Sequence, residues 1–450
     1  MYDAVSIEER NTPTVSLVNY GFANDAESAS RGKGMPVLRV LPTTVPCEAS
    51  IMENIEAGVD GALEATIDAL TRPLSREEES PEPPEPEKVS RIIFKGSLEE
   101  VNRFFYQRGW TDGLPIIPPT EEAVAEMLTG TDLPADHLLG KLESRMGKAT
   151  IEKIAVNAVM AGALPTYMPV LIAGTILLIE SEPGFMGYTT FGFSTGSWSP
   201  FWIINGPIRN EIHVNNSSGA FSPGNIANAA IGRAMGLIIK NIGGVRKGIE
   251  DMGVMGNPMK YSMVIAENEE ASPWEPLHVE YGYKPEDSTV TLSFPQTYLQ
   301  HWPYNADAEG ILRSVMDNIP RGMRYTFIFT PPHAGNLARE GWTKDEIKEF
   351  ITEYARIPGD RYNMAPVIGG GKPTLYKGRI TARDTDTVPV IRDPRFIRII
   401  VGGGPGAFIA QVAGGGATPG KKQTQKIELP KNWDKIVAKY KNVVPTYAKY

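Results

Sequence analysis

The chain has 450 residues, of which 41% are hydrophobic and 22% are charged, a composition typical of a soluble protein with a large core. Its formal net charge is -8, and no Lys/Arg block carries interleaved aromatic residues, which excludes a general nucleic-acid-binding protein. The single cysteine, Cys47, cannot form an intrachain disulfide, and no cysteine cluster exists for zinc or an iron–sulfur centre.

The sequence shows no basic and apolar secretory signal near its N-terminus. The longest apolar stretch, residues 168–179, is shorter than the ~20 residues that a membrane-spanning helix needs. We therefore expect a buried core helix there, no membrane partner and a cytoplasmic protein.

Residues 1–75 are predicted to form a partial, doubly wound α/β domain of the flavodoxin-like kind. A helix comes first and a strand follows at once, so the fragment looks like the middle of such a unit and lacks its first strand. The expected helices cover residues 2–9 and 52–70, and the expected strands cover residues 14–18 and 37–41. Residues 76–90 are rich in Pro and Glu, which predicts an extended, self-repelling linker.

A larger mixed α/β domain is predicted over residues 91–420, followed by a basic C-terminal tail over residues 421–450. Cap signals and apolar periodicity predict helices over residues 97–107, from 120 onward, and over 150–161, 165–179, 226–242 and 343–355. Strands are expected over residues 201–204, 261–266, 288–294, 325–330, 396–401 and 408–412. The glycine-rich run 402–406 resembles a phosphate loop only loosely, and a hairpin or a glycine-rich wall is the favoured interpretation.

The densest chemistry lies in residues 267–278, directly after an expected strand. Two prolines and a tryptophan stiffen this run, and polar groups on a rigid, part-buried loop are typical of active sites. We predict Glu267, Glu269, Glu275 and His278 as catalytic residues, because clustered carboxylates raise one another's pKa toward the range useful for proton transfer. Two other interpretations stay open: Glu275 and His278 as metal ligands, and carboxylates that only cap helices and pair with arginines.

Four residues on nearby segments are predicted to bind substrate. Asn205 and Arg209 flank a Gly-Pro turn after a strand, and an arginine fork binds carboxylate or phosphate in a bidentate manner. Asn225 and Asn228 stand at and inside the start of a helix, where an anion could bind. The alternatives are a buried ion pair for Arg209, a helix cap for Asn225 and a solvent-facing side chain for Asn228.

The remaining isolated residues carry weaker signals. A lone cysteine is more often inert than reactive, and Cys47 follows a proline, which favours an extended turn over a helix start. His333 follows an expected strand and is the most site-like of the scattered histidines.

Several runs resemble the long form of the UGSC family. They are residues 110–120, 145–162, 205–209, 223–225 and 266–278, and residues 2–15 resemble the helix and strand that follow the family's redox motif. The resemblance implies an N-terminal α/β domain similar to the selenoprotein component of glycine reductase. The family's U/C-Gly-Ser-Cys motif is absent from this sequence, and the resemblance implies a place for it just before Tyr2. Two alternatives follow: a separate small subunit supplies the motif, or this member of the family carries out its chemistry without it.

These observations lead to one main hypothesis and two alternatives. The chain is expected to be an enzyme subunit, an oxidoreductase or lyase, that cleaves a carbon–heteroatom bond of a small anionic molecule reductively or by elimination. A partner chain would bring the Cys or Sec, within an oligomer. The alternatives are a metal-assisted hydrolase or lyase and a non-catalytic scaffold subunit. The residues indicate no particular cofactor.

Overall fold

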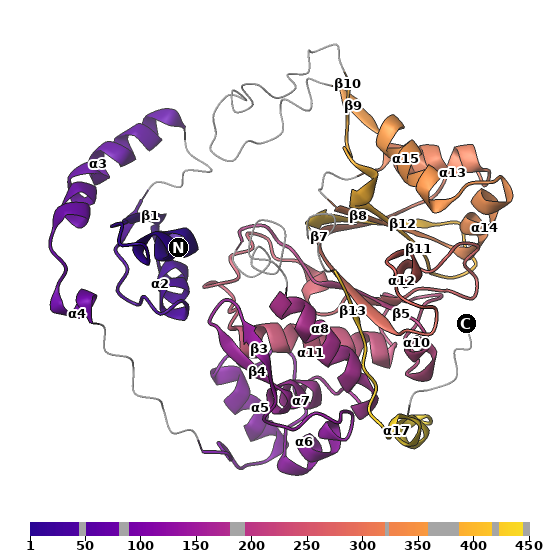
Figure 1. Ribbon diagram of the computed structural model, residues 1–450, viewed down its shortest axis with the longest axis horizontal. Coiled ribbons are helices and arrows are strands. Elements are labelled where there is room, and N and C mark those ends of the chain that lie inside the picture. The colour runs from indigo at the N-terminus through magenta and orange to yellow at the C-terminus, as the bar shows by residue number, and fades with distance from the viewer. Residues whose placement is uncertain are drawn as a thin grey trace.

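The computed structural model describes residues 1–44, 51–80, 90–180, 194–319, 324–358, 387–415 and 423–443 (Figure 1). Cys47 and residues 81–89 of the expected linker lie outside this part of the chain. Helices and a mixed sheet together confirm the predicted α/β class.

The N-terminal segment contains two parallel strands and their connecting helices. Its elements are α1 (Tyr2–Glu8), β1 (Ser16–Asn19), η1 (Tyr20–Phe22), α2 (Ala23–Gly32), β2 (Val40–Thr43), α3 (Met52–Thr71) and α4 (Arg76–Glu79). β1 and β2 pair in parallel, with Ser16 opposite Val40, as a doubly wound unit requires. β2 begins later than predicted, because a turn with Gly34 at φ 87° precedes it.

Two features of this segment depart from the predictions. Helix α2 was not expected, since its buried positions are only Ala and Ser. Part of the expected linker folds back as α4: Ser75 and Glu78 form a capping box, and Glu78 pairs with Arg39 at 2.9 Å.

The larger part of the chain is built on a sheet of order β11-β8-β12-β7-β5-β6, with β13 pairing to β7. The strands are β5 (Phe201–Asn205), β6 (Val264–Ala266), β7 (Thr289–His301), β8 (Arg324–Phe329), β11 (Ile397–Val401), β12 (Ile409–Gly415) and β13 (Thr424–Lys426). β5 with β6 and β8 with β11 are parallel pairs, whereas β7 and β12 join the two halves in antiparallel fashion.

Alternate residues along these strands enter three separate cores. In β5, Trp202 and Ile204 join the core formed with helices α7, α8 and α11, while Phe201 and Ile203 face the other side. In β8, Phe327 packs against the helices of the second half. The third core joins residues of β5 and β6 to residues of β8, β11 and β12, so the sheet is bent and its two halves share an inner face.

Helices cover the outer faces of both halves (Figure 1). The first half carries α5 (Leu98–Gln107), α6 (Glu121–Leu128), α7 (Ile151–Met160), η2 (Pro165–Tyr167), α8 (Met168–Glu180) and α11 (Ile226–Ile238), with the hairpin β3 (Leu138–Leu142) and β4 (Gly147–Thr150). The second half carries α13 (Ala308–Asp317), α14 (Pro331–Arg339) and α15 (Lys344–Tyr354). Within the described ranges, no helix is both long and apolar enough to span a membrane.

The smaller elements complete the chain. They are α10 (Ile208–Glu211), η3 (Ile239–Gly243), η4 (Pro258–Lys260), α12 (Leu277–Glu280), the pair β9 (Arg356–Pro358) and β10 (Thr387–Pro389), η5 (Pro394–Phe396) and α17 (Trp433–Tyr440). The helix expected over residues 226–242 passes from α-helical to π-helical geometry at Ile239 and ends at Gly244, whose φ of 83° suits a helix C-terminus.

Of the two interpretations of the glycine-rich run after β11, the hairpin is wrong, because β8 lies between β11 and β12. The basic segment after residue 421 supplies β13 to the sheet and α17 to the core, where Trp433 and Ile436 are buried.

The N-terminal segment meets the larger part through α2. Ser28 donates to the buried Glu250 at 2.5 Å, and Arg246 pairs with the same carboxylate at 2.5 Å. A Cβ added to Gly32 would lie 2.6 Å from the Ser144 carbonyl oxygen, so only glycine allows this approach. Asp25 lies nearby, and burial followed by the charge of Glu250 raises its pKa to about 7.

Candidate functional site

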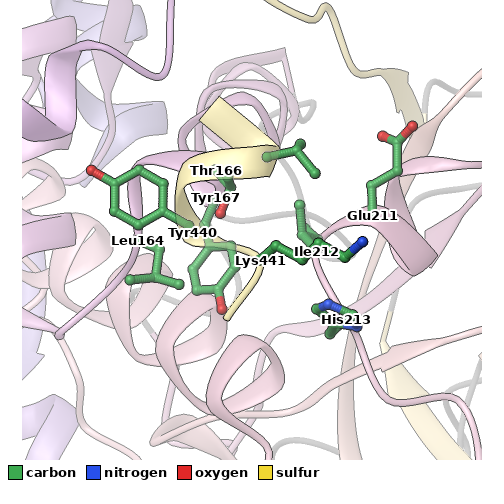
Figure 2. A pocket seen from close by; sticks show the side chains of 9 residues that line it. Leu164, Thr166, Tyr167, Glu211, Ile212, His213, Tyr440 and Lys441 are labelled. Atoms are coloured by element: carbon green, nitrogen blue, oxygen red, sulfur yellow. The ribbon is translucent and has the colours of Figure 1, made fainter. Parts of the chain in front are cut away.

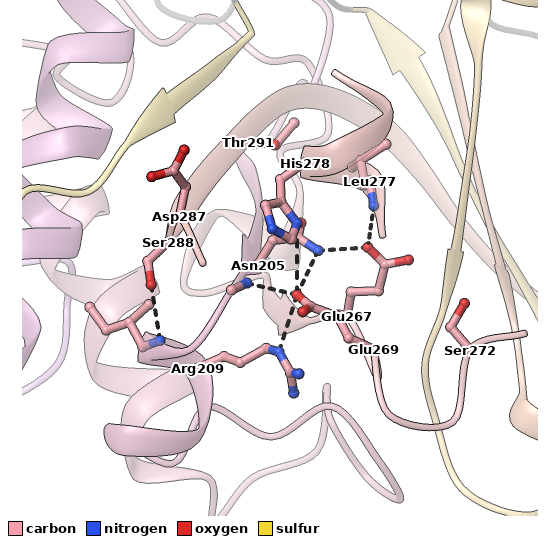
Figure 3. Close-up of polar contacts among 12 residues, drawn as sticks. Asn205, Arg209, Glu267, Glu269, Ser272, Leu277, His278, Asp287, Ser288 and Thr291 are labelled. Atoms are coloured by element: carbon pink, nitrogen blue, oxygen red, sulfur yellow. Dashed lines mark hydrogen bonds and ion pairs between the residues drawn. The ribbon is translucent and has the colours of Figure 1, made fainter. Parts of the chain in front are cut away.

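The parallel strands β5 and β6 end side by side and deliver Asn205 and Glu267 to one place (Figure 3). The chain then runs as a loop over residues 267–276 into α12. Asn268 donates its backbone N–H to the Val401 carbonyl at the end of β11, at 2.8 Å, so the loop connects the two halves of the bent sheet. Trp274 anchors the loop, since its ring nitrogen donates to the Trp342 carbonyl at 2.9 Å.

Glu267 is fully buried. Its Oε2 accepts hydrogen bonds from Asn205 Nδ2 at 2.6 Å and from the Leu277 backbone N–H at 2.8 Å. Lys344 Nζ lies 3.7 Å from Oε1, which has no hydrogen-bond partner in the described part of the chain. Burial outweighs these contacts and raises the pKa of Glu267, so the site favours a protonated carboxyl group.

Glu269 occupies the centre of the cluster. Its Oε1 accepts from the Gly206 backbone N–H at 2.7 Å and from Asn205 Nδ2 at 3.1 Å, and Arg209 Nε lies 3.1 Å away. One guanidinium and two N–H donors therefore converge on this single oxygen. Gly206 has φ 82°, and a Cβ there would lie 2.2 Å from the Asp287 carbonyl oxygen, so this turn needs glycine.

The guanidinium of Arg209 is already occupied. Its two terminal nitrogens donate to the two oxygens of Glu270 at 2.8 and 2.7 Å, and Asn210 Nδ2 adds a third donor at 2.8 Å. The Arg209 hydrogen bonds lower the pKa of Glu270 to about 2. The arginine fork that the sequence suggested for an anionic substrate therefore holds an internal carboxylate, which is half exposed and could be displaced.

His278 is fully buried on α12, with Nδ1 3.9 Å from Glu269 Oε1. Neither ring nitrogen has a hydrogen-bond partner among the described residues, and the same holds for Asn205 Oδ1 and for Thr289 Oγ1 on the neighbouring strand. Asn205 and Thr289 are direct register partners. Buried polar atoms are normally satisfied, so a group of such atoms beside the protonatable Glu267 marks a place for water or a polar ligand.

The other predicted site residues lie apart from this cluster. Glu275 is exposed and has no ion pair or hydrogen bond to the cluster among the described residues. Asn225 occupies the N-cap position of α11, but its side chain donates to the Gly219 and Ser222 carbonyls and does not cap the helix. Asn228 is buried and bonds the Val264 carbonyl at 3.0 Å, so it fixes α11 to β6.

Sequence reasoning missed Lys344, which is 7% exposed in the first turn of α15. Its ammonium group faces Glu267 at 3.7 Å and Glu280 at 3.4 Å. A signal was present: a lysine in the first turn of a helix opposes the helix dipole, so a carboxylate partner elsewhere was to be expected.

No three His, Cys, Asp or Glu side chains come together as a metal site in the part of the chain that the structure describes. The metal interpretation needs Glu275 and His278 in one place, and one is exposed whereas the other is buried. His333 is also buried, with Nδ1 3.1 Å from Thr330 Oγ1, and burial lowers its pKa. These residues therefore do not fit a metal centre.

A small pocket lies away from the cluster, where α17 crosses the end of α10 (Figure 2). It has room for about one water molecule, about 10 Å³. Its wall includes Tyr167, Glu211 and Tyr440. Trp433 Nε1 donates to Glu211 Oε2 at 2.7 Å, so α17 supports the short helix that carries Arg209. We assign this pocket a supporting role for α10.

Comparison with known families bears on the N-terminal segment. Residues 1–72 match the UGSC family. The resemblance predicted from the sequence is thus confirmed for α1 to α3, and this UGSC segment is the part that meets Glu250 through α2. The match does not include the cluster around Glu267. No curated protein and no solved structure matches the chain.

Proposed function

We propose that this chain is an enzyme subunit that transfers protons during cleavage of a carbon–heteroatom bond in a small anionic molecule. One observation carries the proposal: the fully buried Glu267 and the fully buried His278, whose ring nitrogens have no hydrogen bond among the described residues, flank the Arg209-bound Glu269. Burial raises the pKa of Glu267, which favours a carboxyl group that still holds a proton to donate.

The geometry suggests a role for each group in an elimination. Glu269 would orient the His278 ring through Nδ1, which leaves Nε2 to accept a proton from the substrate carbon. Glu267 would donate its proton to the leaving heteroatom, and the electron pair of the broken C–H bond would form the new double bond. Asn205 holds both carboxyl groups and would keep their spacing fixed.

A reductive cleavage would need a thiol or selenol and its electron donor. A partner chain is the proposed source of this group, and the family resemblance of residues 1–72 is what motivates that proposal. Cys47 is expected not to be that nucleophile, so Cys47→Ser should leave turnover within a few fold. An inactivating iodoacetamide adduct mapped to Cys47 would contradict the two-chain arrangement.

The surface of α3 supports the same partner. Met52, Val59, Leu63 and Ile67 are each more than half exposed and lie on one side of the helix at spacings of seven and four residues. An apolar strip on a 20-residue helix that buries only Ala69 favours an oligomer. We therefore propose an assembly with a second chain. We also propose a cytoplasmic location, because a chain with a single cysteine forms no intrachain disulfide and disulfides are rare in cytosolic proteins.

The chemistry can be tested without knowing the substrate. Pools of small carboxylates and phosphates would be incubated with the purified assembly in D₂O and followed by NMR for deuterium uptake or loss of a heteroatom group. Glu267→Gln and His278→Gln should each reduce the rate by about 10²–10⁴-fold, the usual contribution of a positioned acid or base. Glu286 is an exposed residue beyond α12, and Glu286→Gln is the matched control that should leave the rate unchanged.

Two outcomes separate the proposal from its alternatives. If Glu275→Gln abolishes turnover while Glu267→Gln does not, the exposed carboxylate carries the chemistry and the buried cluster is structural. If both buried variants keep full turnover, the chain is a scaffold subunit. The scaffold is the second candidate, favoured by the Arg209 fork that is already filled by Glu270.

A further inference from the structure

Two arginines lie buried on the inner face of the bent sheet. Arg398 on β11 is 1% exposed and Arg324 on β8 is 4% exposed. Arg398 is the register partner of Thr326, two residues from Arg324, so the two side chains point to the same face of adjacent parallel strands. Arg398 alternates with Ile399, which joins the outer core, and this places both guanidinium groups inside the bend.

The contacts of Arg398 are with neutral groups. Nε donates to the Tyr281 hydroxyl at 3.0 Å, and Nη2 faces the Leu292 carbonyl at 3.5 Å and the Gln423 side-chain oxygen. Nη1 has no hydrogen-bond partner among the described residues. No carboxylate pairs with Arg398 in the described ranges.

The contacts of Arg398 differ from those of three other buried cationic side chains, which pair with carboxylates. Arg209 holds Glu269 and Glu270, and Lys344 and Lys348 share Glu280. Buried charges in proteins are normally paired in this way, because an isolated charge is costly to remove from water. Burial and then the charge of Arg398 lower the pKa of Arg324 to about 9.

We propose that Arg398, with Arg324 beside it, binds an anionic oxygen group, a carboxylate or a phosphate, inside the bent sheet. The free Nη1 would donate to the anion, and the second guanidinium would add its positive charge. Tyr281, which Arg398 contacts, is the C-cap residue of α12, the short helix that carries His278. The short helix α12 therefore links the subsite to the acid–base cluster through Tyr281 and His278.

This inference rests on the proposed function only in assigning the anion to the substrate. It gives the chain a recognition element that the Arg209 fork does not provide, since that fork already holds Glu270. The anionic group would anchor one end of the molecule at Arg398, and its reacting carbon would face His278. Anion binding at Arg398 can be measured on its own.

The test uses the intact chain and two probes, inorganic phosphate and malonate, at constant ionic strength set with NaCl. Thermal unfolding of the wild-type protein should show a saturable rise of Tm with one or both probes and none with chloride. The probe that binds more tightly identifies phosphate or carboxylate as the natural group. A Tm that follows ionic strength alone overturns the proposal.

Variants locate the binding. Arg398→Met should weaken the apparent affinity for the better probe by about 10–100-fold, the loss expected for a hydrogen bond to a charged group. Arg395→Met, at a side chain that is 74% exposed and precedes the same strand, should leave the affinity unchanged. Equal loss in both variants, or none in either, contradicts the assignment.

A folding failure of Arg398→Met does not block the test. Arg398→Lys keeps the charge but removes the fork, and line broadening of the phosphate ³¹P signal by wild-type protein needs no variant. Glu267→Gln separates the two proposals. If it keeps anion binding and loses deuterium exchange, both stand; if exchange depends on Glu267 and no anion binds, only the proposed function survives.

Discussion

The UGSC segment and the larger α/β part differ most clearly in what their helices bury. Helix α8 has 13 residues and buries ten of them, among them Leu171 and Leu177. Helix α3 has 20 residues and buries one, Ala69. The larger part thus folds around its own apolar cores, whereas the N-terminal segment contacts it through polar groups at Glu250 and leaves α3 largely exposed. The segment that matches the family therefore buries less apolar surface of its own than the larger part does.

The largest expected effect is the difference in stability loss when a leucine is truncated in each of the two regions. Leu171→Ala should lower the free energy of unfolding by about 2–5 kcal/mol, because it leaves a cavity in the core. Leu63→Ala, at a residue that is 52% exposed, should cost less than about 0.5 kcal/mol. Denaturant unfolding of both variants measures the difference. A loss of several kcal/mol at Leu63 would show that the α3 strip is covered in the free protein.

The next effect tests the contact between the two regions. Glu250→Gln should weaken the attachment of α2 by about 1–3 kcal/mol, since Ser28 and Arg246 lose their buried carboxylate. Hydrogen exchange should then quicken in α2 and stay unchanged in α8. Glu27→Gln, on the exposed side of α2, is the control. Uniform loss of protection over the whole chain would show that the regions fold as one unit.

The pH dependence of the same contact gives a slope in the free energy of unfolding, which can be compared with the single loss expected for Glu250→Gln. The pKa of Asp25 rises on folding from its ordinary value of 3.8 to about 7, so the folded state binds the proton more tightly. The contribution is fully present below pH 3.8 and is lost as pH rises toward about 7, by at most about 1.4 kcal/mol per pH unit. Asp25→Asn should abolish this slope in unfolding experiments. An unchanged slope would assign the dependence to another group.

The smallest effect concerns the two Ser capping boxes. Ser97→Ala on α5 should cost about 1 kcal/mol of global stability, because α5 packs on the first core. Ser75→Ala on α4 should loosen only the local turn, which buries no residue. Equal global losses in urea titrations would mean that α4 is integral to the fold.

Much of the fold could be predicted where local chemistry and packing agree. Capping boxes at Ser97 and Thr343 gave the starts of α5 and α15, and apolar runs gave β5, β8 and β11. Helix α2 was not predicted, because its buried side consists of Ala and Ser. Strand β13 was not predicted either, because it has only three residues. The order of the strands could not be read from the sequence, since β12 inserts beside β8 and not beside its neighbour β11.

The candidate site was predictable only in part. The sequence placed Asn205 and Glu267 each at the end of an expected strand, and the structure shows that these two strands are parallel neighbours, which brings the two residues together. The sequence could not show that Glu269 turns inward while Glu275 turns outward, since both stand on one loop. The directions of these two side chains follow from the Asn268–Val401 backbone hydrogen bond and from the hydrogen bond of the Trp274 ring to the Trp342 carbonyl. Both are contacts with segments distant in the sequence.

The loop over residues 267–276 ties together two halves of a sheet through the Asn268–Val401 hydrogen bond and carries acidic side chains of the site on the same short stretch. Substitutions in this loop are therefore expected to act on the contact between the two halves of the sheet as well as on the cluster. Laboratory selection for new substrates is expected to need stabilising changes elsewhere before the loop itself can vary.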